Sequence, residues 1–198
     1  MVVITSNGLS SDKLLYDLFP YTQNLSTAVI VKTASNPVPS EDKSLPWLED
    51  ELQMLRLSVD WFDFDTDDPA ELLRYDVVEM SGGDPFYLRE SIRKANAESI
   101  LKEIAEEKIL IGISAGAIVQ QQDMSLIARF TTETGRKPRG ELRGIGIVDH
   151  EIMPHYRQFC ERYFQVEERI RQYELETGHR VIRLSDGEGI FLDRTANY

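Results

Sequence analysis

The feature that most constrains this chain is a serine between two glycines, in the stretch Gly112-Ile-Ser-Ala-Gly-Ala117. An apolar run at 108–111 precedes it and predicts a buried strand, and residues 115–122 are free of proline and compatible with a helix. A chain that turns this sharply leaves no room for a Cβ on either side of the serine, which explains the two glycines. The pattern is typical of a nucleophile elbow, in which Ser114 exposes its Oγ above a helix N-terminus. Taken alone, it also fits a tight turn whose serine caps the helix.

Strand and helix patterns alternate on the N-terminal side of this elbow. Short apolar or β-branched runs predict strands at 2–5, 28–33, 59–64, 77–80 and 108–111. Helical periodicity predicts helices at 10–19, 47–57, 86–94 and 97–107. The proline-rich residues 34–46 predict a loop and the acidic residues 65–69 a turn. This alternation predicts an α/β fold, with a mostly parallel sheet flanked by helices on both faces.

The pattern is less regular after Gln122. In this part we expect several short strands within 124–142 around a tip at 135–140, a strand over 144–153, a long charged helix over 157–175, and closing strands over 181–184 and 189–192. We see no internal repeat, low-complexity segment or linker. Residues 1–198 are therefore expected to form a single domain.

Composition narrows the function classes. The net charge of −12 argues against nucleic acid or an anionic membrane as a general partner. The single cysteine, Cys160, excludes an intramolecular disulfide and a multi-cysteine metal site. No apolar stretch approaches the length of a membrane span, and the N-terminus lacks the basic region of a signal peptide. We expect a cytoplasmic protein without a metal or cofactor.

A nucleophilic serine needs a general base within hydrogen-bonding reach, usually histidine. The chain has three histidines. His155 is the best candidate because Pro154 stiffens the backbone where the chain leaves the expected strand over 144–153. His150 lies inside that strand. His179 follows Gly178 at the end of the expected long helix, where a helix cap is a sufficient explanation.

The base in turn needs an orienting acid, and an acyl-transfer site needs hydrogen-bond donors for the oxyanion. The acid is either Asp186 or Glu188, in the glycine-rich turn after an expected strand, although such a turn also has a purely structural explanation. One oxyanion donor would be the backbone N–H of Ala115. The other would come from Gly82 or Gly83, in a loop that follows the neighbouring expected strand.

At this point the chain resembles a known family. Ser81-Gly-Gly-Asp-Pro-Phe-Tyr-Leu88, the elbow and Met153-Pro-His-Tyr156, in this order, are similar to motifs of the peptidase E (aspartyl dipeptidase) and cyanophycinase family of serine peptidases, peptidase family S51. The resemblance covers nearly the whole chain. It implies a fold like that of class I glutamine amidotransferases, with serine in place of the elbow cysteine. It also implies Ser114 as nucleophile, His155 as base and Asp186 as orienting acid, where the best-known members have glutamate.

Two departures bear on the substrate that the resemblance implies, a small peptide beginning with aspartate. Aspartyl dipeptidases carry a further acidic residue between the nucleophile and the histidine, and Asp123 is the nearest candidate. They also bind the substrate's aspartate through an arginine early in the helix after the histidine, and Val166 occupies that place here. Three nearby arginines are candidates to replace it: Arg157, Arg162 and Arg169. The substrate's first residue and the oligomeric state stay open.

Three alternative functions compete with a peptidase. An esterase or lipase shares the elbow, but that class places its acid before a late histidine and often has a His-Gly-Gly loop. A glutamine amidotransferase would need a cysteine at the elbow, whereas Cys160 lies elsewhere. A family member that only binds a ligand would have no need of an intact Ser-His-acid set.

Overall fold

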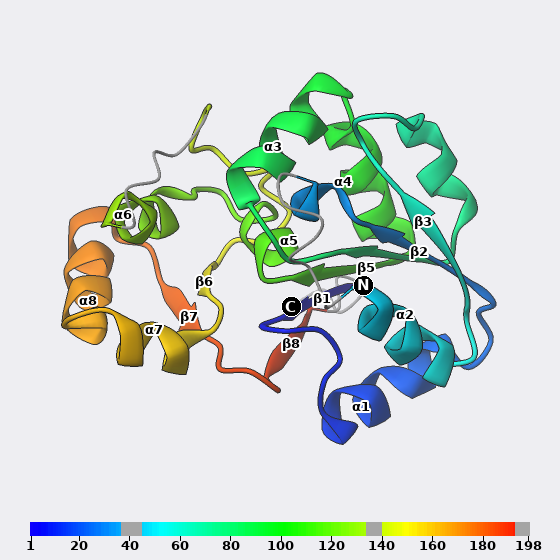
Figure 1. The fold of residues 1–198 in the computed structure, drawn as a ribbon, viewed down its shortest axis with the longest axis horizontal. Coiled ribbons are helices and arrows are strands. Elements are labelled where there is room, and N and C mark those ends of the chain that lie inside the picture. The colour runs from blue at the N-terminus through cyan, green and yellow to red at the C-terminus, as the bar shows by residue number, and fades with distance from the viewer. Residues whose placement is uncertain (37–44, 134–139, 193–198) are drawn as a thin grey trace.

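The computed structural model describes residues 1–36, 45–133 and 140–192. A six-stranded sheet with the order β3-β2-β4-β5-β1-β8 forms its centre (Figure 1). The strands are β1 (Val2–Thr5), β2 (Thr27–Val31), β3 (Ser58–Phe62), β4 (Val77–Met80), β5 (Ile109–Ile113) and β8 (Gly189–Leu192). The first five pair in parallel, and only β8 runs antiparallel to its neighbour β1. The mostly parallel α/β sheet predicted from the sequence is confirmed.

Helices cover both faces of this sheet (Figure 1). On one face lie α1 (Asp12–Thr22) and α2 (Leu45–Met54), and on the other α3 (Pro85–Lys94), α4 (Glu98–Glu107) and α5 (Ala115–Ile118). Two 3-10 turns, η1 (Thr33–Ser35) and η3 (Pro69–Arg74), follow β2 and precede β4. Alternate residues of β4 enter the two cores, since Val77 packs with α1 and α2 while Val78 and Met80 pack with α3 and α4. Burial on both faces explains why β1, β2 and β5 are almost entirely apolar.

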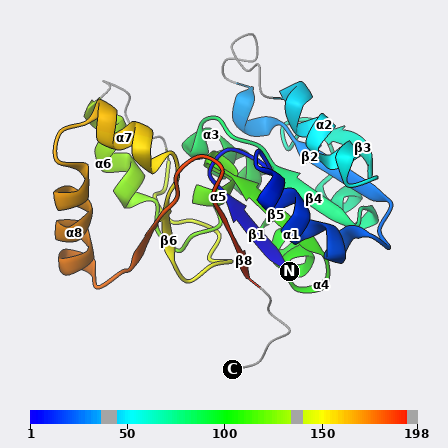
Figure 2. The ribbon, with the colours of Figure 1, turned by 90° about the horizontal axis from the view of Figure 1, so that it is seen from below.

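A second group of elements lies to one side of the sheet, as Figures 1 and 2 both show. It contains the parallel pair β6 (Glu151–Met153) and β7 (Val181–Arg183), together with α6 (Ser125–Glu133), α7 (Tyr156–Arg162) and α8 (Val166–Thr177). Its core is a separate apolar cluster of seven residues: Leu126, Phe130, Met153, Val166, Ile170, Tyr173 and Val181. The expectation that the chain forms one domain stays a prediction.

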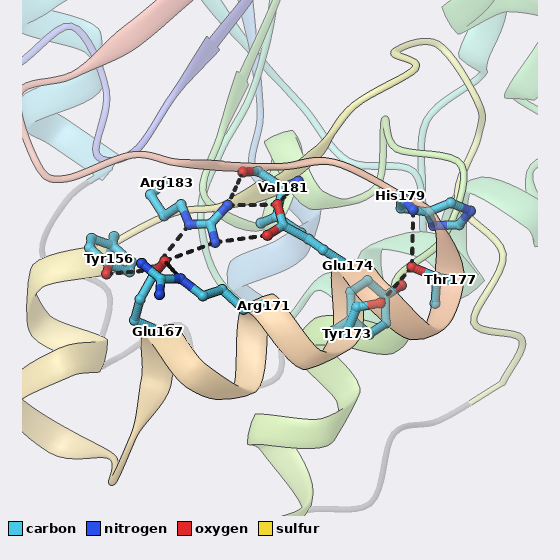
Figure 3. Close-up of polar contacts among 9 residues, drawn as sticks. All are labelled: Tyr156, Glu167, Arg171, Tyr173, Glu174, Thr177, His179, Val181 and Arg183. Carbon is cyan, nitrogen blue, oxygen red and sulfur yellow. Dashed lines mark hydrogen bonds and ion pairs between the residues drawn. The ribbon is translucent and has the colours of Figure 1, made fainter.

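Ion pairs attach α8 to β7 (Figure 3). The Arg183 guanidinium donates to Glu174 at 2.7 Å and to Glu167 at 3.2 Å. The hydrogen bonds to Glu174 raise the pKa of Arg183 and lower the pKa of Glu174. Burial would raise the pKa of Glu167, but its hydrogen bonds, first among them those from Arg183, outweigh burial and lower it. Since Arg183 is the last residue of β7, these contacts fix where the chain leaves for the turn that carries Asp186.

The strands expected within 124–142 are wrong for the residues that the structure describes, because 125–133 form helix α6. Asp123 accepts the N–H of Ser125 at 2.5 Å, as a helix-capping carboxylate does. Leu126 and Phe130 then lie one helical turn apart and enter the apolar cluster beside α8. Tertiary burial thus overrides the strand preference of the β-branched residues here. Most of the expected tip at 135–140 lies outside the described residues.

The long helix expected over 157–175 is two helices, α7 and α8. The chain turns extended at Tyr163 and left-handed at Gln165, where φ is 50°. Tyr163 stacks on Phe159 with ring centroids 5.2 Å apart, and both rings meet Phe130 of α6 edge-on. The break between α7 and α8 therefore lies beside a cluster of three aromatic rings that joins α7 to α6.

Two further expectations were too long. The strand over 144–153 is confirmed only for 151–153, because the amides of Ile145, Gly146 and Ile147 donate to carbonyl groups at 119–121. The helix after the elbow ends at Ile118, and the residues that follow it, whose carbonyl groups accept these bonds, form turns. No helix among the described residues has both the length and the apolar character that crossing a membrane requires.

Candidate active site

The elbow at the end of β5 has the backbone that its glycines predict. Ser114 adopts φ 46° and ψ −102°, a backbone conformation that residues other than glycine rarely adopt. A Cβ on Gly116 would stand 2.2 Å from the carbonyl oxygen of Met80. A Cβ on Gly112 would stand 2.1 Å from the Gln120 side chain and 2.7 Å from the oxygen of Gly116. The tight turn that lifts Ser114 out of the strand therefore leaves room only for glycine at both positions.

Ser114 and His155 come together at the carboxyl edge of the sheet. The Oγ of Ser114 lies 3.0 Å from Nε2 of His155, and Nδ1 of that ring lies 2.7 Å from Oδ1 of Asp186. The side chains of His155 and Asp186 are 32% and 33% exposed, so a solute can reach them. A neutral imidazole whose Nδ1–H donates to Asp186 leaves Nε2 able to accept a proton from Ser114.

The carboxylate of Asp186 is held by three side chains. Oδ1 accepts hydrogen bonds from Ser6 Oγ at 2.8 Å and from His155, and Oδ2 accepts one from the amide of Gln158. Burial alone would raise the pKa of Asp186, but these hydrogen bonds and the charge of His155 outweigh it and lower the pKa. Asp186 is therefore kept as the anion that can orient and stabilise a charged imidazole.

The turn that carries Asp186 is tied to the loop after β1. The N–H of Gly187 donates to the Asn7 side chain at 2.8 Å, and Ser11 Oγ donates to the oxygen of Gly187 at 3.0 Å. The carboxylate of the other candidate acid, Glu188, accepts the N–H of Ser185 at 2.7 Å, within its own turn. Of the two acids that the sequence left open, the fold brings Asp186 to the histidine.

The loop expected to supply oxyanion donors runs past Ser114. An ideal Cβ on Gly82 would lie 3.5 Å from the Cβ of Ser114, and one on Gly83, whose φ is 135°, would lie 2.3 Å from the oxygen of Ala34. The Ser81 and Asp84 amides anchor this loop, because they donate to Val31 and Ala34 at 3.1 and 2.9 Å.

The three expected donor groups face no competing acceptor. Within residues 1–36, 45–133 and 140–192, the backbone N–H groups of Gly82, Gly83 and Ala115 form no hydrogen bond. Gly82 lies beside Ser114, and Ala115 is the first residue of α5. Amides without a partner beside a serine are what a developing oxyanion requires.

The remaining predicted site residues take other roles in the fold. Asp123 caps α6, as described above. Arg162 lies over the Tyr163 ring at 5.6 Å, and Arg169 over the Phe130 ring at 4.1 Å. Arg157 is exposed on α7. The hydrogen bonds of the Ser114 and His155 side chains go to each other and to Asp186.

Val166 and His179 also belong to the second group of elements. Val166 is 3% exposed and packs in the apolar cluster between α6 and α8. His179 follows the left-handed Gly178 that ends α8, and its backbone N–H donates to the hydroxyl of Thr177 (Figure 3). Its ring bonds to Glu151, which also accepts from Tyr173. Among the described residues, no group of three or more His, Cys, Asp or Glu side chains is arranged to hold a metal ion.

Sequence reasoning missed Ser6 and Gln158. A lone serine after a strand carries no signal of its own. Knowing that β1 pairs in parallel with β5 would have placed Ser6 at the same sheet edge as Ser114. Gln158 follows His155 by three residues, the spacing that shares one helix face.

The fold and these side chains define a class: an α/β protein with a serine, a histidine and a carboxylate in hydrogen-bonding order at the edge of a parallel sheet. The model for peptidase family S51 matches residues 4–196, and the chain belongs to this family.

Three curated relatives are described as uncharacterized peptidases. Lmo0363 of Listeria monocytogenes is 29% identical over 110 residues, which are 53% of this chain and 54% of the relative. Lin0382 of Listeria innocua is 30% identical over 88 residues, 44% of this chain and 42% of the relative. PM1590 of Pasteurella multocida is 27% identical over 106 residues, 51% of each. The chain thus spans about half the length of the curated relatives it matches.

Two solved structures share the fold. A protein of Listeria monocytogenes EGD-e provisionally named peptidase E superposes with a TM-score of 0.77 at 22% identity, covering 96% of this chain and 93% of that chain. A peptidase from an acI-B1 actinobacterium has a TM-score of 0.64 at 17% identity, covering 95% of this chain and 81% of that chain. At these identities the likeness supports the fold alone.

Proposed function

We propose that this chain is a serine peptidase that hydrolyses small peptides. Membership of peptidase family S51 supports the reaction class. The observation that carries the proposal is the continuous chain of hydrogen bonds from Ser114 through His155 to Asp186, with distances of 3.0 and 2.7 Å. Such an order of groups supplies a nucleophile, a base and an orienting anion.

In the first half of the proposed reaction, Ser114 Oγ attacks the carbonyl carbon of the scissile peptide bond while its proton passes to Nε2 of His155. The carbonyl oxygen becomes an oxyanion, which the N–H groups of Ala115 and of Gly82 or Gly83 stabilise. His155 then gives its proton to the leaving nitrogen, the C–N bond breaks, and the amine departs. An ester on Ser114 remains.

Water completes the cycle. His155 takes a proton from water as the water oxygen attacks the ester, and a second oxyanion forms in the same place. Its collapse breaks the bond to Ser114 Oγ, which recovers its proton from His155, and the carboxylic acid product leaves. Asp186 stays ionised throughout and stabilises the imidazolium that forms twice in each turnover.

The arrangement of the nearby arginines bears on which substrate this site would bind. A dipeptidase that requires an N-terminal aspartate needs a cation to bind that side chain, and Val166 at the expected position is buried in an apolar cluster. Arg162 and Arg169 lie over aromatic rings, which leaves Arg157 as the exposed arginine nearest in sequence to His155. This favours, as a second candidate function, hydrolysis of another acyl substrate by the same three residues, or a ligand-binding role.

The test is hydrolysis of a library of dipeptides and tripeptides varied at the first residue, by the wild type and by Ser114→Ala. We expect the substitution to lower turnover by at least about 10³-fold without changing the fold. Ser91→Ala is the control, because it removes the hydroxyl of a buried serine that donates to Asp65 at 2.7 Å and lies outside the proposed machinery.

A fluorophosphonate probe separates the alternatives. Labelling that Ser114→Ala abolishes supports an activated serine whatever the natural substrate is. Peptide cleavage that persists in Ser114→Ala would overturn the mechanism, and no labelling of the wild type by several probes would favour the ligand-binding role.

A further inference from the structure

Ser6 occupies a place in the site that the mechanism above does not use. It follows β1 directly, and β1 pairs with β5, whose end carries Ser114. Its side chain is fully buried. A buried hydroxyl needs hydrogen-bond partners, so the identity of those partners indicates what the residue does.

Both partners of the Ser6 hydroxyl belong to the site. Its oxygen accepts the backbone N–H of His155 at 2.8 Å, and its own O–H donates to Oδ1 of Asp186 at 2.8 Å. One hydroxyl therefore bridges the main chain of the base and the carboxylate of the acid. The donor and acceptor directions are fixed, because an N–H only donates and an ionised carboxylate only accepts.

The bond to His155 falls where the backbone needs support. His155 has φ 54° and ψ 32°, the left-handed conformation that is uncommon for residues other than glycine. This conformation directs the imidazole from the start of α7 toward Ser114. A hydrogen bond to that same amide stabilises the unusual backbone at the point where it sets the ring's direction.

We propose that Ser6 is a positioning residue of the hydrolytic reaction, which locks the His155 backbone and the Asp186 carboxylate into one geometry so that Nε2 stays aimed at Ser114. The inference rests on the proposed function. The hydroxyl of Ser6 bonds to the base and to the acid, so it acts on the reaction through these two partners. Its donation to Asp186 is also one of the interactions that keep that carboxyl ionised.

The first measurement is the separate determination of kcat and KM for Ser6→Ala. Loss of a hydrogen bond to a charged group should lower kcat by about 10- to 100-fold, and KM should stay within about two-fold because no substrate contact is lost. Ser91→Ala, which removes a buried serine–aspartate bond elsewhere, should leave kcat unchanged. Should Ser6→Ala fail to fold, Ser6→Cys takes its place, because a thiol is close in shape to a hydroxyl but is a weaker hydrogen-bond donor. It should lower kcat as well, by a smaller factor than expected for Ser6→Ala.

A double-mutant cycle with Asp186→Ala distinguishes positioning from a general structural role, with the rate of Ser114 labelling by a fluorophosphonate as readout. If Ser6 acts through Asp186, Ser6→Ala should slow labelling much less when Asp186 is already absent. An equal slowing in both backgrounds, or an unchanged kcat in Ser6→Ala, overturns the proposal. Absence of any Ser114-dependent turnover or labelling in the wild type would instead refute the proposed function, so the two failures are distinguishable.

Discussion

A buried carboxyl pair under the loop after β1 makes the stability of this protein depend on pH. Glu51 of α2 is 4% exposed; its Oε2 accepts the N–H of Leu9 at 2.6 Å, and its Oε1 has no partner within the described residues. Glu79 of β4 is fully buried, and neither of its oxygens has a partner there. Burial, opposed in part by the Leu9 bond, raises the pKa of Glu51 to about 7. Burial and the charge of Glu51 raise the pKa of Glu79 well above its ordinary value.

The sign of the effect follows from proton binding. Between pH 4.5 and pH 7 the folded protein keeps the Glu51 proton while the unfolded chain has lost it. The unfolded state binds fewer protons, so the free energy of unfolding falls as the pH rises through this window. The Glu51 contribution is fully present below pH 4.5 and is lost as the pH passes 7. With a pKa of 4.5 for Glu51 in the unfolded chain and of about 7 in the folded protein, the free energy of unfolding falls by about 2.5 kcal/mol between pH 5 and pH 8.

Glu51→Gln tests this reasoning. Glutamine keeps an acceptor for the N–H of Leu9 but carries no titrating proton. The free energy of unfolding is measured by urea unfolding, followed by circular dichroism, at pH 5 and at pH 8. From pH 5 to pH 8 it should fall by about 2 to 3 kcal/mol less in Glu51→Gln than in the wild type. Asp50→Asn, on the exposed side of α2, is the control and should behave as the wild type. An equal pH dependence in Glu51→Gln would mean that this carboxyl ionises in the folded protein as readily as in the unfolded chain.

Two further substitutions test the geometry of the elbow and of α8. Gly116→Ala places a methyl group 2.2 Å from the oxygen of Met80 and should cost about 1 to 3 kcal/mol of stability and slow fluorophosphonate labelling; melting and labelling like the wild type would show that the elbow tolerates a Cβ. Arg183→Met leaves Glu167 and Glu174 without their shared cation and should destabilise the protein by about 1 to 3 kcal/mol in thermal unfolding. Unchanged stability would mean that water replaces the arginine without cost.

Most of the N-terminal half of the fold could be predicted because β1, β2, β4 and β5 are buried on both faces, although the edge strand β3 is largely exposed. A strand of this kind is a continuous apolar run, and proline, glycine or acidic turns bound each one in the sequence. The predicted 2–5 and 77–80 coincide with β1 and β4. The part after Gln122 could not be predicted as well, because α6, α7 and α8 form their helices around aromatic contacts between residues far apart in the sequence, such as Phe130 with Phe159.

The residues of the site also differ in how far the sequence alone could predict them. Ser114 and its glycines were predictable because a local steric demand fixes them, and His155 because a proline precedes it. The choice between Asp186 and Glu188 was not, since the two differ by two positions in one turn and only the tertiary contacts of that turn decide which reaches the histidine.

The hydrogen bonds that bring Asp186, and not Glu188, to the histidine come from the loop after β1. The family resemblance implies a glutamate at this place. Because an aspartate side chain is one methylene shorter, the main chain of Asp186 must lie closer to the imidazole than that of a glutamate would. Asn7 and Ser11 hold the backbone of Gly187, and Ser6 holds the carboxylate itself. The acid and the loop that anchors it are about 180 residues apart in sequence, and β8 pairs antiparallel with β1 beside them. The reach that the shorter side chain lacks is therefore supplied by the sheet, which makes residues 6–11 as much a part of the site's geometry as the elbow.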